Sequence, residues 1–304
     1  MASLATSALT LPKHLATGLW SKAQSGSTVA VLSGAEPMLF GETQLMTFTQ
    51  KPKAQYVAEG ADKSGTDPGF GTKTVTPHKV QVTMRFNQEV QWADEDYQLG
   101  VLSALADASG EALARALDIG VYHGINPLTG AVVPSIVAGD RIATTTNSVE
   151  LTTATLTTPD LVLEEAAGLV IADGYTPNGI ALDSGYAWTI ATSRYTDGRK
   201  KFPELGLGIN VSAFEGITAS VSSTVSAPEA TAATGVKAII GDFSQLRWGV
   251  QRRIGVEKIE YGDPDGLGDL KQKNQIALRA EVVYGWAVMD LDAFATVVDK
   301  VANE

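Results

Sequence analysis

Two unusually long strands near the C-terminus most restrict what this chain can fold into. Over residues 247–261 and again over 276–288, apolar side chains recur at every second position, the period of a strand with one buried face. At about 3.3 Å per residue, a strand of roughly 15 residues spans about 50 Å, whereas most strands have only five or six residues. A change of phase at Glu257 and Lys258 predicts a bulge in the first strand. The pair favours an elongated domain over a globule.

A third alternating segment indicates a hairpin that projects from the rest of the chain. The return strand, over 80–86, alternates apolar and polar residues, and a weaker outgoing strand precedes it over 45–57. The connecting tip, 59–71, is polar and rich in glycine. Connections of this length are uncommon inside compact domains, and an isolated two-stranded ribbon is marginal in water. We therefore expect the hairpin to rest on a surface, which can belong to another subunit.

The middle of the chain combines one long helix with a mixed α/β segment. Leucine and alanine at three- and four-residue spacing predict a helix over 94–122. Thr158 as the cap and Pro159 at the first helical position predict a second helix that ends near residue 172. The other predicted elements are a strand over 178–182, a helix over 183–195 and strands over 217–221 and 236–240. Residues 1–45 keep no period and indicate an extended arm.

Composition argues against several kinds of chemistry. The chain has no cysteine, three scattered histidines and no phosphate-binding, nucleophile-elbow or zinc-protease motif. We therefore predict no enzyme activity, no metal site and no cofactor. Asp263, Asp265 and Asp269 lie in a glycine-rich turn that could hold Ca²⁺, but the closing glutamate of a calcium loop is missing. A solvated turn is the simpler interpretation.

Charge and hydropathy restrict the partners. Lys and Arg number 23 against 34 Asp and Glu, which gives a net charge of −11. An acidic protein does not bind nucleic acid tightly and non-specifically, because that requires clustered basic residues. No apolar run approaches the roughly 20 residues that span a bilayer, so we predict no membrane association.

Five stretches, taken in order, resemble the major capsid proteins of tailed phages, the Hong Kong 97-type fold, in particular those of actinobacterial siphophages. They are Tyr-Val-Ala-Glu-Gly at 56–60 before the polar tip, the long helix over 94–122, Gly-Tyr-Thr-Pro-Asn-Gly-Ile at 174–180, Asn-Gln-Ile-Ala-Leu-Arg-Ala-Glu at 274–281, and Asp-Leu-Asp-Ala-Phe at 290–294. The resemblance covers about residues 45–297.

The resemblance implies an α+β fold of five segments. They are an N-terminal arm (1–44), an extended hairpin loop (45–91), a peripheral domain with a long spine helix (92–126), a mixed α/β axial domain (127–245) and a return to the peripheral domain with its long β-strands (246–304).

The resemblance also implies a function. Copies of such a protein form pentamers and hexamers of an icosahedral shell that encloses double-stranded DNA without sequence-specific binding. The expected location is the virion capsid, assembled in the host cytoplasm. Expected partners are further copies of the chain, a portal and, where the particle has one, a decoration protein. Because the arm starts almost at Met1, we also expect a separate scaffolding protein. Two alternatives are an encapsulin-like nanocompartment, which would hold protein cargo, and a soluble α/β enzyme or binding module.

Specific residues follow from the same resemblance. The hairpin residues expected at subunit contacts are Glu59, Lys63, Asp67, Phe70 and Lys73, and those of the long strand are Arg279 and Glu281. Some family members join subunits by an isopeptide bond, for which the matching residues here are Lys63 or Lys73, Asn274 and, as base, Glu281. Such a lysine must lose its proton beside a buried carboxylate. The alternative is a non-covalent contact in which Arg279 and Glu281 pair with each other.

Overall fold

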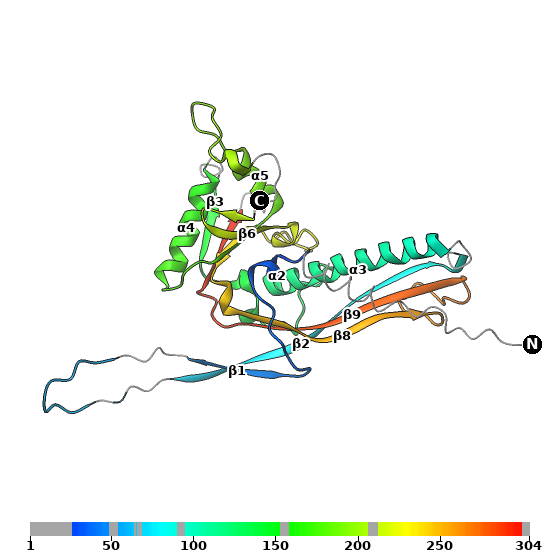
Figure 1. The fold of residues 1–304 in the computed structure, drawn as a ribbon, viewed down its shortest axis with the longest axis horizontal. Coiled ribbons are helices and arrows are strands. Elements are labelled where there is room, and N and C mark those ends of the chain that lie inside the picture. The colour runs from blue at the N-terminus through cyan, green and yellow to red at the C-terminus, as the bar shows by residue number, and fades with distance from the viewer. Residues whose placement is uncertain are drawn as a thin grey trace, which may run out of the picture.

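A computed structural model describes residues 26–48, 54–63, 65, 69–89, 95–152, 158–205 and 212–299. Two β-sheets organise the molecule, one long with four strands and one compact with six. Figure 1 shows an elongated body, with a hairpin projecting at one end and the compact sheet rising from the middle. The fold is therefore α+β and elongated, as the long alternating strands predicted.

The four-stranded sheet is antiparallel, in the order β1-β2-β9-β8. Its strands are β1 (Thr43–Phe48), β2 (Phe70–Asn87), β8 (Leu246–Ile259) and β9 (Gln275–Val288). β8 and β9 each have 14 residues, which confirms the two long strands. The register of β8 shifts between Ile254 and Glu257, where the change of phase predicted a bulge, and also between Val250 and Arg252, where none was predicted.

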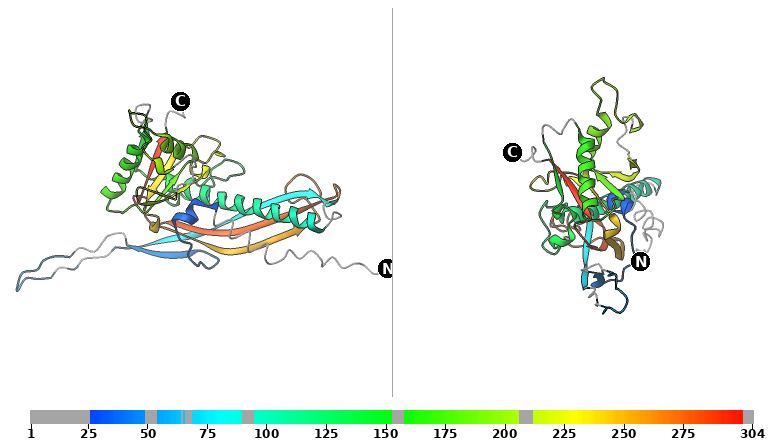
Figure 2. Two further views of the ribbon diagram at one scale, coloured as in Figure 1. Left: turned by 45° about the horizontal axis from the view of Figure 1, so that its top comes forward. Right: turned by 90° about the vertical axis from the view of Figure 1, so that its left-hand side faces the viewer.

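The long helix, α3 (Glu95–His123), lies lengthwise along this sheet, in nearly the direction of its long strands (Figure 2). Its buried side chains, including Leu113, Leu117 and Val121, share one core with Tyr284 and Trp286 of β9. Close packing leaves little room for a side chain at residue 120. A Cβ atom on Gly120 would lie 3.1 Å from the Trp286 ring. The helix boundaries agree with the sequence prediction to within a residue.

The six-stranded sheet has the order β3-β10-β7-β4-β6-β5 and mixes parallel with antiparallel pairs. The strands are β3 (Ser148–Leu151), β4 (Gly179–Leu182), β5 (Ala213–Phe214), β6 (Ile217–Val221), β7 (Val236–Gly241) and β10 (Phe294–Asp299). Two helices pack on it, α4 (Pro159–Ala172) and α5 (Ser184–Thr192). Thr158 is the N-cap of α4, but its side chain makes no capping hydrogen bond. The helix start therefore depends on Pro159, whose fixed φ suits the first turn.

Short 3₁₀ turns join these elements. They are η2 (Ala138–Asp140), η3 (Ile142–Thr144), η5 (Pro203–Leu205), η6 (Ser223–Val225) and η7 (Phe243–Gln245). Two of them, η2 and η6, hold side chains from distant parts of the chain and are described below.

Two segments differ from the sequence expectation. The arm predicted over 1–44 is not wholly extended, because residues 28–32 form a short helix, α2 (Thr28–Leu32), and Val29 is completely buried. The last strand, β10, pairs with β3 and β7 in the six-stranded sheet, although residues 246–304 were assigned to the part that holds the long strands. Both differences arise from pairing between residues far apart in sequence, which local periodicity does not reveal.

Candidate assembly surface

The hairpin leaves the four-stranded sheet at a defined point. β2 pairs with β9 from Thr76 to Asn87, and with β1 from Phe70 to Val75. The change of partner between Val75 and Thr76 is the root of the hairpin (Figure 1). Beyond this root, β1 and β2 pair only with each other among the strands that the structure describes. A ribbon of two strands gains little stability alone, so the geometry suits contact with another molecule.

The outer face of the hairpin carries exposed apolar side chains. Met46 is 71% exposed and Phe70 is 63% exposed. Met46 lies opposite Thr72 in the register, so Phe70 is its diagonal neighbour on the same face. Exposed large apolar residues that gather in one place mark interaction surfaces. We call Met46 and Phe70 together the hairpin apolar pair.

The hairpin is exposed over residues 54–63 and at residue 65. Glu59 and Lys63 are both exposed, and so is the Tyr56 side chain. Asp67 lies outside the described residues. The expected contact roles of Glu59, Lys63 and Asp67 stay predictions.

Lys73 contacts its own subunit at the hairpin root. Its Nζ donates to the carbonyl oxygen of Gly139 at 2.9 Å and lies 3.3 Å from the Asp140 carboxylate, both in η2. Lys73 therefore lies on the inner face of the hairpin, the same face as the buried Val75. The sequence grouped Lys73 with the expected contact residues of the hairpin, and the structure places it at the hairpin root; its expected contact with another subunit stays a prediction.

The two charged residues predicted on β9 do not pair with each other. Glu281 forms an ion pair with Lys79 of β2, with Nζ and Oε2 2.9 Å apart. Arg279 donates from Nε to Thr83 Oγ1 at 3.1 Å and from a terminal nitrogen to the Pro264 carbonyl at 3.0 Å. Both are thus engaged inside the subunit, and the interpretation of an Arg279–Glu281 pair is wrong.

The four residues considered for an isopeptide bond do not meet within one subunit. Lys63 lies on the projecting hairpin, whereas Asn274 precedes β9 at the opposite end of the long sheet (Figure 1). Lys73 contacts η2 and Glu281 contacts Lys79. A covalent link between copies of the chain stays a prediction.

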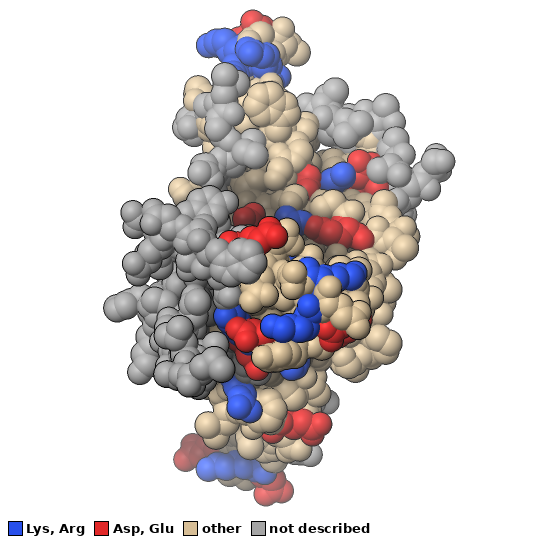
Figure 3. Space-filling model, turned by 90° about the vertical axis from the view of Figure 1, so that its right-hand side faces the viewer, with Lys and Arg blue, Asp and Glu red and all other residues tan. Residues whose placement is uncertain are grey.

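The turn that follows β8 is pinned to the sheet by Arg85. The Arg85 guanidinium contacts the carboxylates of Asp263 and Asp265, and donates to the carbonyl of Gly268 at 3.0 Å. Two of the three acidic residues considered for Ca²⁺ therefore contact an arginine, and the third, Asp269, accepts the backbone N–H of Gln272 at 3.0 Å. Figure 3 looks onto this end of the molecule, where acidic and basic side chains lie intermixed.

This pinning predicts a loop that loosens in acid. The hydrogen bond from Arg85 lowers the pKa of Asp265 below its ordinary value of 3.8. A carboxylate with a lowered pKa stabilises the fold above that ordinary value, and the contribution is lost as pH falls through the lowered one. Compared with its value at about pH 6, hydrogen exchange of residues 262–274, corrected for intrinsic rates, is expected to rise as the pH falls below about 4. An Arg85→Met variant should already exchange fast at the higher pH; Arg247→Met is the control. Equal protection in wild type and Arg85→Met would contradict this prediction.

A buried carboxylate on α3 holds the N-terminal segment. Asp118 is completely buried. Its oxygens accept hydrogen bonds from the hydroxyls of Ser27, Thr28 and Thr224, and from the backbone N–H groups of Thr28 and Val29 at 2.9 and 3.1 Å. Burial raises the pKa of Asp118, and these hydrogen bonds oppose the rise. We call this set the Asp118 clasp; it joins α2, α3 and η6.

Sequence reasoning missed the Asp118 clasp. The available signal is a single acid beside the apolar stripe of α3, next to Leu117 and one turn from Tyr122. Buried charges occur almost only with partners. The pattern could thus have indicated a buried polar network, but not which residues complete it.

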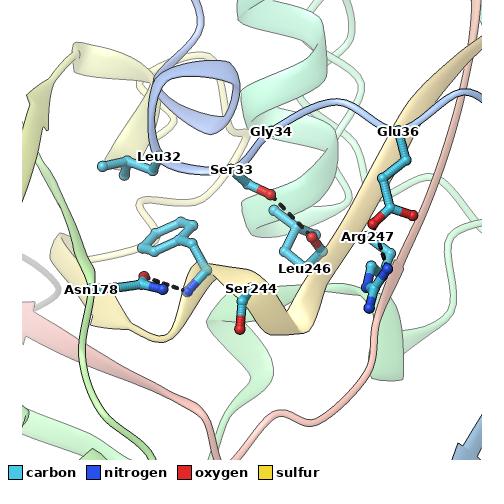
Figure 4. Close-up of a pocket in the computed structure, with 9 residues that line it drawn as sticks. Leu32, Ser33, Gly34, Glu36, Asn178, Ser244, Leu246 and Arg247 are labelled. Atoms are coloured by element: carbon cyan, nitrogen blue, oxygen red, sulfur yellow. Dashed lines mark hydrogen bonds and ion pairs between the residues drawn. The ribbon is translucent and has the colours of Figure 1, made fainter.

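A shallow pocket marks the place where the N-terminal segment crosses onto β8 (Figure 4). Several residues that line it are joined by hydrogen bonds and an ion pair. Ser33 donates to the Leu246 carbonyl at 3.0 Å, the Phe243 N–H donates to Asn178 at 2.8 Å, and Glu36 pairs with Arg247. Ser33 and Glu36 connect the segment after α2 to β8, and the Phe243–Asn178 bond joins η7 to the residue before β4. We interpret the pocket as a structural joint.

The outward face of α4 is a second exposed surface. Leu161 is 54% and Ile171 is 61% exposed, and Glu164, Glu165 and Gly168 lie between them on the same face. A Cβ atom on Gly168 would meet nothing within 4 Å. Glycine at this position is therefore not required by packing inside the subunit.

Gly168→Ala is expected to stabilise the subunit. Glycine inside a helix costs about 1 kcal/mol relative to alanine, and here the added methyl group has open space. Urea unfolding of the unassembled subunit should show a gain of about that size. The control is Gly120→Ala on α3, where the methyl group would press on Trp286 and the gain should disappear. A loss of stability in Gly168→Ala would contradict the prediction.

No helix in the described ranges combines the length and apolar character that a bilayer crossing needs. Within the same residues, no group of three or more His, Asp or Glu side chains is arranged to hold a metal ion.

Comparison with known proteins gives one consistent result. The phage capsid family matches residues 7–299. A curated relative, the probable major capsid protein gp17 of Mycobacterium phage D29, is 25% identical over 296 residues, covering 93% of this chain and 88% of its own. A solved chain from Mycobacterium phage Ogopogo is 52% identical with a TM-score of 0.81, covering 90% of this chain and 92% of its own. A solved chain from Gordonia phage Cozz is 32% identical with a TM-score of 0.77, and the match covers 90% of this chain and 86% of that one.

Proposed function

This chain belongs to the phage capsid family, and we infer from that membership that it is the major capsid protein of a tailed phage, the subunit of the virion shell. The observation that carries the inference is the extent of the match, from residue 7 to residue 299. The named relative is a probable major capsid protein that aligns over 88% of its length. The projecting hairpin supports the same conclusion, because such a ribbon suits contact with another copy.

At a finer level we propose the Hong Kong 97-type arrangement. The long sheet with α3 forms the peripheral domain, the six-stranded sheet forms the axial domain, and the hairpin lies over a neighbouring subunit. Contacts of this kind join different surfaces of two copies, and they close into rings when the rotation between copies is a simple fraction of a turn. Pentamers and hexamers are the proposed rings. The hairpin apolar pair supports this proposal, since it has a large exposed area available for a neighbour.

We propose that the shell encloses double-stranded DNA without binding it strongly. The net charge of −11 repels the phosphate backbone at long range, and counterion release from DNA needs clustered basic residues. A scaffolding protein, a portal and, in some particles, a decoration protein are the proposed partners, with assembly in the host cytoplasm. We propose no catalytic role.

Electron microscopy with light scattering tests the function. The chain, expressed with its phage's scaffolding protein, is expected to form closed shells or capsomer rings. A subunit that stays monomeric or dimeric with the scaffold present would contradict the proposal. Boiled shells on a denaturing gel test the crosslink between Lys63 and Asn274 of neighbouring copies, because a single band near 31.9 kDa excludes it.

A further inference from the structure

At the root of the hairpin, Lys73 of β2 contacts one turn of the main body, two residues from the buried Val75. The Nζ of Lys73 lies 2.9 Å from the Gly139 carbonyl oxygen and 3.3 Å from Asp140 Oδ1. Lys73 is only three residues from Thr76, where the pairing of β2 with β9 begins. Both contacts therefore act at the point where the ribbon loses its sheet neighbour.

The turn that Lys73 contacts, η2, is itself hydrogen-bonded to β9. Asp140 Oδ1 also accepts the backbone N–H of Val288 at 3.3 Å, and the Asp140 carbonyl accepts the indole N–H of Trp286 at 3.1 Å. Trp286 and Val288 are buried residues of β9. Because η2 is hydrogen-bonded to the end of β9, the hydrogen bond from Lys73 to η2 connects the hairpin to the core of the subunit.

We propose that Lys73 is a positioning residue for assembly, whose bonds to η2 fix the direction in which the hairpin leaves the subunit. This role rests on the proposed function of the hairpin as a contact with a neighbouring copy. It differs from the crosslinking role considered from the sequence, because the ammonium group is used inside its own subunit.

The length of the hairpin explains why a single contact at its root can affect assembly. Phe70 is six residues beyond Thr76, or about 20 Å along an extended strand. A rotation of about 10° at the root would move Phe70 by roughly 3–4 Å, as far as the separation of two carbon atoms in contact. A small change of angle at Lys73 would therefore separate the hairpin apolar pair from its place on a neighbour.

The direct test measures the hairpin in the unassembled subunit. Because the chain has no cysteine, cysteines placed at the exposed Thr72 on β2, farther from the root, and at Glu165 on α4 carry a unique pair of spin labels. Lys73→Met keeps the apolar stem and removes the ammonium group. We expect it to widen the distance distribution between the labels at least twofold. Lys73→Arg, which keeps a donor, should restore the narrow distribution.

Lys79→Met is the matched control, because Lys79 lies on the same strand and pairs with Glu281 across the sheet. Its distance distribution should equal that of the wild type. An unchanged width in Lys73→Met would overturn the proposal, whatever the assembly results.

Assembly provides the second readout. With scaffold present, Lys73→Met is expected to yield at least tenfold fewer uniform closed shells than the wild type, and Lys79→Met and Lys73→Arg to stay within twofold. Normal shells from Lys73→Met would also overturn the proposal. If the wild type itself forms no shells, the proposed function fails, whereas the distance measurement still decides whether Lys73 positions the hairpin.

Discussion

Replacing both Met46 and Phe70 by aspartate is expected to abolish closed shells while leaving a folded subunit. Both side chains are mostly exposed in the subunit, and substitutions at such sites usually change stability by less than about 0.5 kcal/mol. On a neighbour, each apolar side chain would contribute about 1.5–3 kcal/mol on full burial. Burying an unpaired carboxylate at the same contact would cost more free energy than the apolar side chain had contributed. The defect recurs at every copy of the contact, so the loss of assembly should be complete.

Microscopy of scaffold-assisted assembly and thermal unfolding of the subunit check this result together. The matched control is the double variant Met46→Leu and Phe70→Leu, which keeps apolar side chains at both positions and should assemble. Normal shells from the aspartate variant would show that the hairpin apolar pair is not an assembly contact.

Asp118→Ala is expected to destabilise the subunit strongly. The change leaves the donors of Ser27, Thr28, Val29 and Thr224 without their shared acceptor. Each buried donor left unsatisfied costs about 1–3 kcal/mol. Part of the N-terminal segment around α2 can detach, so that its freed donors bind water and the individual costs do not simply add. We therefore expect a total loss of about 3–5 kcal/mol in the free energy of unfolding.

Urea unfolding measures that loss, and hydrogen exchange should show residues 26–33 losing protection first. Glu111→Ala is the control, since Glu111 is an exposed acid on the same helix and its removal should have little effect. If Asp118→Ala unfolds at the same urea concentration as the wild type, the Asp118 clasp does not stabilise the fold.

Local patterns were enough to predict the elements with strong periodicity. β6 spans the predicted residues 217–221, and β9 begins within one residue of the start of its alternating segment. The exposed position of Glu59 and Phe70 on the hairpin also follows from the sequence, because a ribbon between polar turns has few other places to lie.

Contacts between distant residues were not predictable in the same way. Arg279 appeared free to reach a neighbour, yet it bonds to Thr83, 196 positions away in the chain. Lys73 meets η2, and Ser27 meets Asp118, across separations of 66 and 91 residues. Nothing in the local sequence specifies such partners, since hydrogen-bonding capacity is shared by many polar residues and only the assembled fold selects among them.

The continuity of β2 has a mechanical consequence. One strand runs from the free hairpin into the middle of the four-stranded sheet, where it is bonded to β9 over the register from Thr76 to Asn87. A pull along the hairpin therefore loads this whole row of backbone hydrogen bonds in shear, and none can yield before the others. Tension that a neighbouring copy exerts on the hairpin would be spread over the length of the subunit rather than concentrated at a hinge.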